Sequence, residues 1–175
     1  MIWSKLKKRI KDNIIPELKN RIDIHFTRYH HAHDGAGEIW ITIDKEKIIG
    51  GGVYHWYTTK LPENISSKED FDIEHGIHKD FFSLVIENED VFLIMNSGIH
   101  NTYHFTENLE NYINTNYDVC LKSNNPIFKA IALVDKRLGK RRFNNIKLND
   151  NDHILVKSFY NLRKEVFNKK SKNDI

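Results

Sequence analysis

The spacing of apolar residues changes along this chain, and the change restricts the fold more than the composition does. Residues 23–29 and 39–44 alternate between apolar and polar side chains and are rich in β-branched and aromatic residues. This alternation is typical of strands that bury one face. A tight turn at 44–46 leads into a third β-branched segment at 47–49. The three segments therefore predict a small antiparallel meander.

Before the meander, the apolar spacing is helical. Apolar residues recur every three to four positions over residues 3–14, with lysines on the opposite side, which predicts an amphipathic N-terminal helix. Ser4 is the candidate N-cap of this helix, and Pro16 is the residue expected to end it.

After the meander, the last third of the chain also predicts helices. One helix spans 106–122 with Thr106 as its N-cap. A second begins at Asn125, before a proline, and continues to Gly139, which ends it as a left-handed cap. A final helix follows Asp152 as its N-cap.

These segments predict a single α+β domain over 1–168, followed by a frayed, charged tail at 169–175. The domain combines an N-terminal helix, a small antiparallel sheet (meander) and a helical C-terminal half. The chain is 39% hydrophobic, which is enough for a core, and no apolar run approaches the ~18 residues of a membrane span. The basic N-terminus lacks the apolar stretch of a signal peptide, and the single cysteine, Cys120, excludes an intrachain disulfide. We therefore expect a cytoplasmic protein with no membrane contact.

Charge is distributed unevenly along the chain. Residues 1–60 carry a net +4, from 11 Lys and Arg against 7 Asp and Glu. Residues 61–120 carry a net −10, from 2 against 12, and residues 121–175 a net +9, from 14 against 5. Either the acidic middle packs beside the basic end and neutralises it, which we favour, or the two form separate faces with separate partners.

Four stretches of the sequence occur together in a recognisable order. They are Trp-Ser-Lys-Leu-Lys-Lys at 3–8, Arg28-Tyr followed by His33-Asp-Gly-Ala-Gly and Ile41-Thr-Ile-Asp44, Leu-Val-Asp-Lys-Arg-Leu-Gly-Lys-Arg-Arg at 133–142, and Phe-Tyr-Asn-Leu-Arg at 159–163. Together they resemble a family of small bacterial proteins of unknown function. The resemblance implies a compact cytoplasmic protein, and it brings no activity, cofactor or catalytic residue. We expect no cofactor.

The most specific of these stretches has a structural interpretation. On a helix that ends at Gly139, Arg137 lies in the last turn, where a cation stabilises the negative end of the helix dipole by ~0.3–1 kcal/mol. Asp135 lies one turn earlier and can pair with Arg142 or with Arg163 of the final helix. We interpret the following four residues as a structural signature: Asp135, Arg137, Gly139 and Arg163.

Lys140, Arg141 and Arg142 are less well explained by that interpretation. Three cations in a turn beyond a helix end are candidate contacts to phosphate or nucleic acid, because arginine forks match phosphate oxygens. Short Lys- and Arg-rich runs are also common on solvated faces. The sequence contains no zinc-finger, RNA-recognition or KH-loop motif.

A histidine-rich stretch is the candidate metal site. In an extended segment His31 and His33 point the same way and can share one ion, with Asp34 as a further ligand. We favour a solvated loop instead, because the stretch follows a predicted strand and Asp34-Gly35 is an ordinary turn pair.

Three functions are compatible with these patterns. The uneven charge and the aromatic run at 54–57 favour a non-enzymatic protein-binding or regulatory protein, such as a toxin neutraliser or a subunit of a bacterial assembly. Its expected partner is another protein. The alternatives are a nucleic-acid-binding protein that uses the basic C-terminal region, and a metal-dependent hydrolase built on the histidine cluster.

Overall fold

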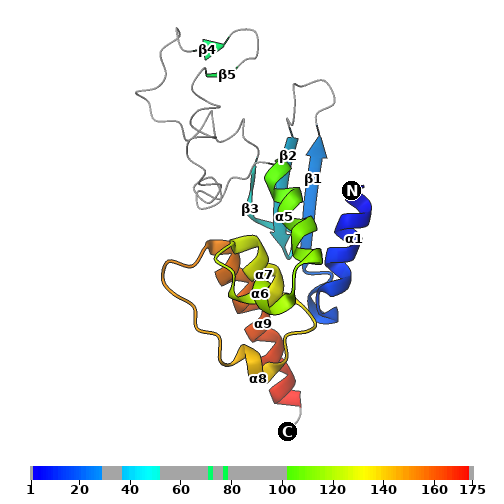
Figure 1. The fold of residues 1–175 in the computed structure, drawn as a ribbon. Coiled ribbons are helices and arrows are strands. Elements are labelled where there is room, and N and C mark those ends of the chain that lie inside the picture. The colour runs from blue at the N-terminus through cyan, green and yellow to red at the C-terminus, as the bar shows by residue number, and fades with distance from the viewer. Residues whose placement is uncertain (1, 29–36, 52–70, 73–76, 79–101, 174–175) are drawn as a thin grey trace.

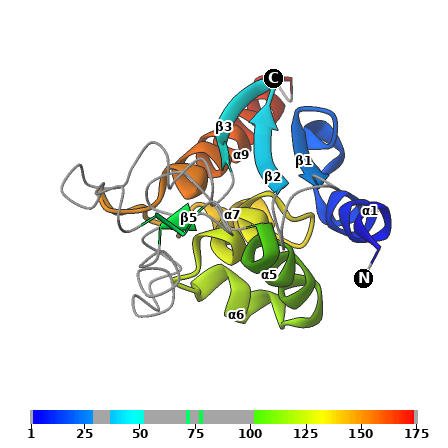
Figure 2. The same ribbon diagram turned by 90° about the horizontal axis from the view of Figure 1, so that it is seen from above.

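The chain has the predicted α+β architecture (Figure 1). The computed structural model describes residues 2–28, 37–51, 71–72, 77–78 and 102–173. Within these residues, an N-terminal helix precedes a three-stranded antiparallel sheet, and helices make up the C-terminal half. Seen from above, α1 lies next to β1 and α9 lies next to β3 (Figure 2).

The N-terminal helix α1 spans Trp3–Asn13, as the apolar spacing predicted. Its buried residues Leu6 and Ile10 belong to the hydrophobic core. The N-cap is Ile2, which makes no side-chain capping bond, so the prediction of Ser4 as N-cap was wrong. Ser4 lies in the first turn and stays exposed. The helix ends shortly before Pro16, which starts the 3₁₀ helix η1 (Pro16–Leu18).

The main sheet is the predicted meander. Its strands are β1 (Ile22–Arg28), β2 (Gly37–Ile43) and β3 (Glu46–Gly51), in the order β1-β2-β3. Asp44 and Lys45 form the turn between β2 and β3 with φ values of 50° and 75°, as two-residue hairpin turns of the primed type require. Two short strands, β4 (Phe71–Asp72) and β5 (Ile77–His78), pair separately.

One face of this sheet belongs to the core. In the β1–β2 register Ile24 stands opposite Ile41, and Phe26 stands opposite Ile39. Ile39 and Ile41 of β2 are fully buried. Helix α5 (Thr102–Asn114) packs against β2 and lies in front of it in Figure 1. The period-2 alternation thus divides each strand into a core side and an outer side.

On the outer side of the sheet, Trp40 constrains the residue across from it. Its ring stacks on His25 with centroids 5.0 Å apart. Its cross-strand partner is Gly50, which has φ +147°. A Cβ at this position would lie 2.2 Å from the Cβ of Trp40, so only glycine fits.

The predicted helix over 106–122 is two helices. Helix α5 begins before Thr106, so Thr106 is not its N-cap, and α6 spans Tyr117–Lys122. The break has a local cause, because the Thr115 hydroxyl donates to the backbone carbonyl of Asn111 at 2.7 Å and so occupies an acceptor at the helix end. Asn116 then caps α6 by accepting from the Asp118 N–H at 2.9 Å.

Helix α7 spans Pro126–Val134 and is the most buried helix of the described part of the chain. Its predicted start is confirmed, since the Asn125 side chain accepts from the N–H of Ile127 at 3.0 Å. Helices α5, α6 and α9 all pack against it. Its apolar side chains therefore occupy the centre of the helical half.

The last helix, α9, spans Ile154–Asn173 and follows the four-residue helix α8 (Lys140–Phe143). The prediction of Asp152 as its N-cap was wrong. His153 takes that role, because its Nδ1 accepts from the Leu155 N–H at 3.1 Å. Asp152 instead pairs with Lys129 of α7 at 2.6 Å, and this contact fixes the loop before α9.

Candidate functional site

The segment between α7 and α8 contains the most specific part of the sequence, and Asp135 determines its shape. Helix α7 ends at Val134, and Asp135 is extended, with φ −67° and ψ 141°. Its Oδ1 accepts from the Arg137 N–H at 2.8 Å, which closes a local turn that competes with helix. The predicted helix up to Gly139 was therefore wrong.

Gly139 has a different role from the predicted left-handed cap. It is the N-cap of α8, with φ −77° and ψ 159°, a conformation that any residue adopts. Arg137 accordingly lies outside any helix, and the stabilisation by a helix dipole does not apply to it. Lys140, Arg141 and Arg142 form one helical turn rather than an irregular turn.

Backbone hydrogen bonds fix this segment to the end of α1. The Ile15 N–H donates to the Val134 carbonyl at 3.0 Å, and the Lys136 N–H donates to the Asn13 carbonyl at 2.8 Å. The Lys136 ammonium also donates to the backbone oxygen of Asp12 at 3.0 Å. Ile14 and Asp135 thereby form an isolated antiparallel β-bridge between the two segments.

The Asp135 carboxylate is fully buried, and both of its oxygens accept hydrogen bonds. Arg137 Nε donates to Oδ1 at 2.9 Å and Arg137 Nη2 to Oδ2 at 2.7 Å, while the Tyr112 hydroxyl donates to Oδ2 at 2.7 Å. Burial raises the pKa of Asp135, but the hydrogen bonds from Arg137 and Tyr112 outweigh it and hold that pKa below its usual value. Neither predicted partner, Arg142 or Arg163, pairs with Asp135.

Arg163 of α9 holds the same segment from the other side. It is 4% exposed, and its guanidinium donates to the carbonyl of Val134 at 3.5 Å and to the carbonyl of Leu138. Within the described residues it has no carboxylate partner, and its Nε has no hydrogen bond. Burial lowers the pKa of Arg163. The structure thus brings Asp135, Arg137 and Arg163 together around one short segment.

Tyr117 joins this segment to α6. Its buried hydroxyl donates to the Ala132 carbonyl at 3.2 Å, and burial together with the Asp135 charge raises its pKa to about 12. The guanidinium carbons of Arg137 and Arg142 lie 4.7 and 5.2 Å from the ring centroid of Tyr117. Arg142 also forms an ion pair with Asp118 of α6. These contacts place α6 beside α8.

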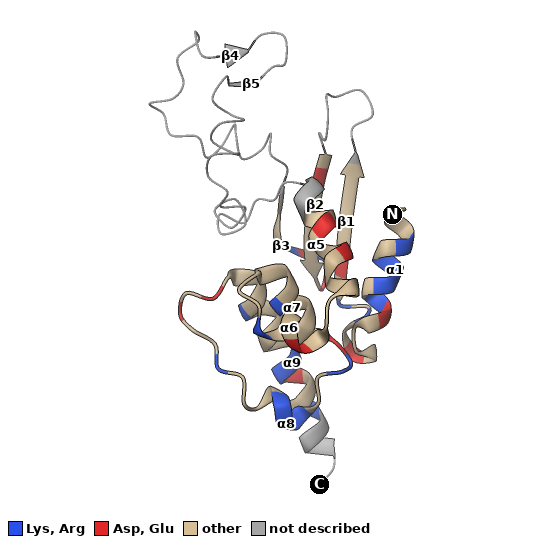
Figure 3. Ribbon diagram, viewed as in Figure 1, with Lys and Arg blue, Asp and Glu red and all other residues tan. Residues whose placement is uncertain are grey.

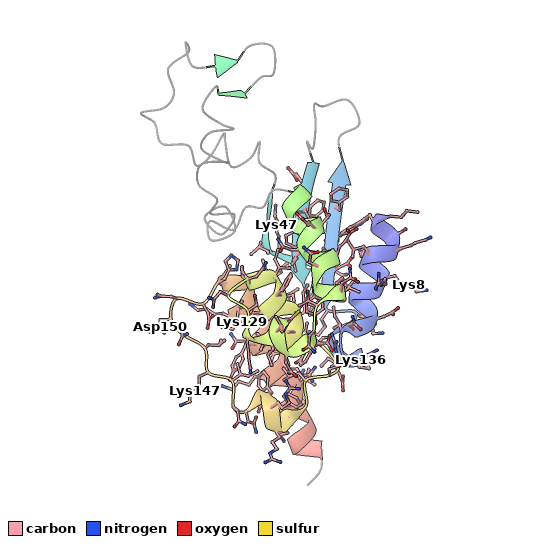
Figure 4. All side chains as sticks on the ribbon, viewed as in Figure 1. Lys8, Lys47, Lys129, Lys136, Lys147 and Asp150 are labelled. Atoms are coloured by element: carbon pink, nitrogen blue, oxygen red, sulfur yellow. The ribbon has the colours of Figure 1, made fainter. Side chains whose placement is uncertain are left out.

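The result is an exposed, mainly basic surface that we call the α6–α8 surface. Figure 3 shows α8 as a cluster of Lys and Arg near the lower end of the molecule. Val119 of α6 is 58% exposed. Figure 4 shows Lys136 and Lys147 on either side of α8. The α6–α8 surface consists of Asp118, Val119, Lys140, Arg141 and Arg142.

The sequence patterns identified part of this site. Asp135, Arg137, Arg163 and the cations of α8 were candidates, although their partners were not. Tyr112, Tyr117 and Asp118 were not among the candidate residues. The one signal in the sequence that could have identified Tyr112 and Tyr117 is that they are tyrosines, because the hydroxyl of a buried tyrosine needs a hydrogen-bond partner.

Other predictions about chemistry fall largely outside the described residues. His31, His33 and Asp34 lie there, and so does the aromatic run at 54–57. In the part of the chain that the structure describes, no three His, Cys, Asp or Glu side chains gather in a group that could hold a metal ion. Cys120 is fully buried, and this burial raises the pKa of its thiol.

The charge and membrane predictions are also tested only in part. Arg142 and Asp118 form one ion pair between the basic end and the acidic middle, but most acidic residues of the middle third are outside the described ranges. Neutralisation of the middle by the basic end stays a prediction. Among the described helices, none has the length and apolar character needed to cross a bilayer.

Comparison with known proteins identifies one family. The model of the SF0329 protein family matches residues 2–164, which include all four stretches that carry the sequence resemblance. The comparisons with curated proteins and with solved structures found no match. Because the family match covers most of the chain, the protein belongs to the SF0329 protein family.

Proposed function

We propose that this chain is a non-enzymatic binding protein whose α6–α8 surface docks on an acidic face of another protein. The ion pair between Arg142 and Asp118 is the observation that supports this proposal most directly. Val119, the next residue of α6, is 58% exposed and lies on the same helix as the carboxylate that pairs with α8. Protein interfaces combine apolar contacts with arginine in this way, with a polar rim around them.

The way in which α8 is anchored also supports a binding role. Leu138 and Phe143 are buried on either side of the three exposed cations, and Arg163 holds the carbonyl of Leu138. Phe143 stacks on Tyr160 of α9 with ring centroids 4.7 Å apart. A surface that is held in place before binding loses less conformational entropy when the partner docks.

The reactive groups near this surface already have structural partners. The carboxylate of Asp135 is committed to Arg137 and Tyr112, so it is not a free base. The thiol of Cys120 is buried and has a raised pKa, so it is a poor nucleophile. These observations favour recognition over catalysis by this part of the chain.

An acidic protein fits the surface better than nucleic acid does. Affinity for nucleic acid grows with the number of phosphates that are neutralised. Helix α8 offers three cations, Lys140, Arg141 and Arg142, and Arg142 already forms an ion pair with Asp118, so few phosphates could be neutralised here. Val119 would gain burial against an apolar protein side chain but little against phosphate.

The partner would be met in a bacterial cytoplasm, as a regulated protein, a toxin or a neighbouring subunit of an assembly. The buried, unpaired thiol of Cys120 is compatible with a reducing compartment. The sequence resemblance to small bacterial proteins supports the same setting.

The proposal can be tested by affinity capture with matched charge variants. Lys140→Glu/Arg141→Glu reverses two exposed charges of the α6–α8 surface, and Lys5→Glu/Lys8→Glu reverses two exposed charges of α1. We expect the wild type and the α1 variant to retain the same acidic protein and the α8 variant to lose it. The captured protein is then purified and its direct binding is measured. Equal retention by all three proteins would refute the proposal.

Nucleic-acid binding predicts a different outcome. Fluorescent DNA and RNA would bind the wild type at low salt, and binding would weaken steeply as salt rises. Lys140, Arg141 and Arg142 would carry that binding, so their joint replacement by alanine would abolish it. This outcome, without an acidic protein partner, would replace our proposal with the nucleic-acid one.

A further inference from the structure

We infer that the α6–α8 surface contains, at its border, a subsite for a single carboxylate, formed by the guanidinium groups of Arg137 and Arg142 beside the ring of Tyr117. The inference rests on the proposed function and adds the chemical group that the surface recognises. That group is an Asp or Glu side chain of the protein partner.

The first argument is that both guanidinium groups keep unused donors. Arg137 uses Nε and Nη2 for Asp135, and Arg142 uses Nη2 for Asp118. Within the described residues, no hydrogen bond involves Nη1 of Arg137 or Nε and Nη1 of Arg142. The two side chains are 45% and 49% exposed, so a ligand in solution can reach them.

The second argument is that these donors are already oriented. The two bonds from Asp135 hold Arg137 in one plane, and the carboxylate that makes them is itself fully buried. The ring of Tyr117 lies within 4.7 Å of one guanidinium carbon and 5.2 Å of the other. The donors that remain on the two guanidinium groups can each give a charge-assisted hydrogen bond to a carboxylate oxygen.

The test compares two exposed arginines that lie on different helices. Arg142→Lys keeps the charge and can keep the pair with Asp118, but it removes the planar guanidinium group. Arg9→Lys is the matched control, because Arg9 is an exposed arginine of α1 and lies outside the α6–α8 surface. Glutarate is titrated into ¹⁵N-labelled protein while the arginine Nε–H resonances are followed. Sodium chloride at equal ionic strength is the reference.

We expect the Nε–H resonance of Arg142 to shift saturably with glutarate and not with chloride. Arg142→Lys should weaken glutarate binding about tenfold, as expected for the loss of one charge-assisted hydrogen bond, and Arg9→Lys should leave it unchanged. Wild-type affinity in Arg142→Lys, or equal weakening in both variants, would overturn the inference.

The subsite and the proposed function can fail separately. If Lys140→Glu/Arg141→Glu loses the protein partner while Arg142→Lys retains it at full affinity, the surface is correct and the subsite is not. If glutarate binds as predicted and no acidic protein is captured, the subsite stands and the proposed function is wrong.

Discussion

Replacing Arg137 by alanine should destabilise the protein strongly, although the side chain itself is half exposed. The reason is its partner: the Asp135 carboxylate is fully buried and receives two of its hydrogen bonds from the Arg137 guanidinium. Removal of one member of a buried ion pair leaves an uncompensated charge and typically costs 3–5 kcal/mol. Because Arg137 is 45% exposed and partly screened, we expect about 3 kcal/mol at pH 7.

The pH dependence of this loss gives a sharper signature than its size. In the wild type the pKa of Asp135 is lowered, so its stabilising contribution is present above the unfolded pKa of about 4 and is lost as pH falls through the folded pKa. Without Arg137, burial dominates and raises the folded pKa above the unfolded value. The variant should then regain stability as pH falls from 7 towards about 4, and its deficit relative to the wild type should narrow.

Urea unfolding of both proteins at a series of pH values between 4 and 7 measures this effect. Arg141→Ala is the control, because Arg141 is an exposed arginine of α8 and should change the free energy of unfolding by less than about 0.5 kcal/mol. If Arg137→Ala lowers the free energy of unfolding by less than about 1 kcal/mol, or if its deficit relative to the wild type stays constant with pH, the pair of Asp135 and Arg137 does not stabilise this segment.

Three further predictions concern single residues. Gly50→Ala should lower the free energy of unfolding by more than about 2 kcal/mol, because its Cβ would collide with Trp40. Gly139→Ala should change it by less than about 1 kcal/mol, because the space around Gly139 is open. Thermal unfolding of the two variants measures both changes. Asn125→Ala should lower the free energy of unfolding by about 1 kcal/mol through loss of the α7 cap, measured by urea unfolding, and an unchanged value would contradict the capping assignment. Cys120 should react with a thiol reagent in the native state far more slowly than in urea, and fast native labelling would contradict its burial.

The parts of the fold that follow from periodicity could be predicted from the sequence. The alternation around Ile39 and Ile41 placed β2 correctly, because a strand that buries one face needs that pattern. Asn125 before a proline placed the start of α7, since a cap and a first-turn proline act locally. The resemblance to a family of unknown function is confirmed by the family match over residues 2–164.

Helix boundaries were harder to predict, because several neighbouring side chains can act as caps. Ser4, Thr106 and Asp152 were all plausible N-caps, and none of them caps a helix in the structure. His153 rather than Asp152 is the N-cap of α9 because Lys129, which belongs to α7, forms an ion pair with the Asp152 carboxylate. Such a competition is tertiary and leaves no signal in the local sequence.

The candidate site was only half predictable for a similar reason. The cations around Gly139 were evident, and Asp135 was predicted to pair with Arg142 or Arg163, but its actual partners were not foreseen. Its turn forms because a buried tyrosine and an arginine stabilise the carboxylate together. Likewise, the partners of Arg163 are backbone carbonyls, which no pattern of residue types can reveal.

The central claim, that the α6–α8 surface binds an acidic protein, is tested most directly by the affinity of the purified captured partner. Its dissociation constant is measured for the wild type, Lys140→Glu/Arg141→Glu and Lys5→Glu/Lys8→Glu. We predict that the α8 variant binds at least about tenfold more weakly and that the α1 variant stays within about twofold of the wild type. Equal affinity of all three proteins, or equal weakening of both variants, would contradict the claim.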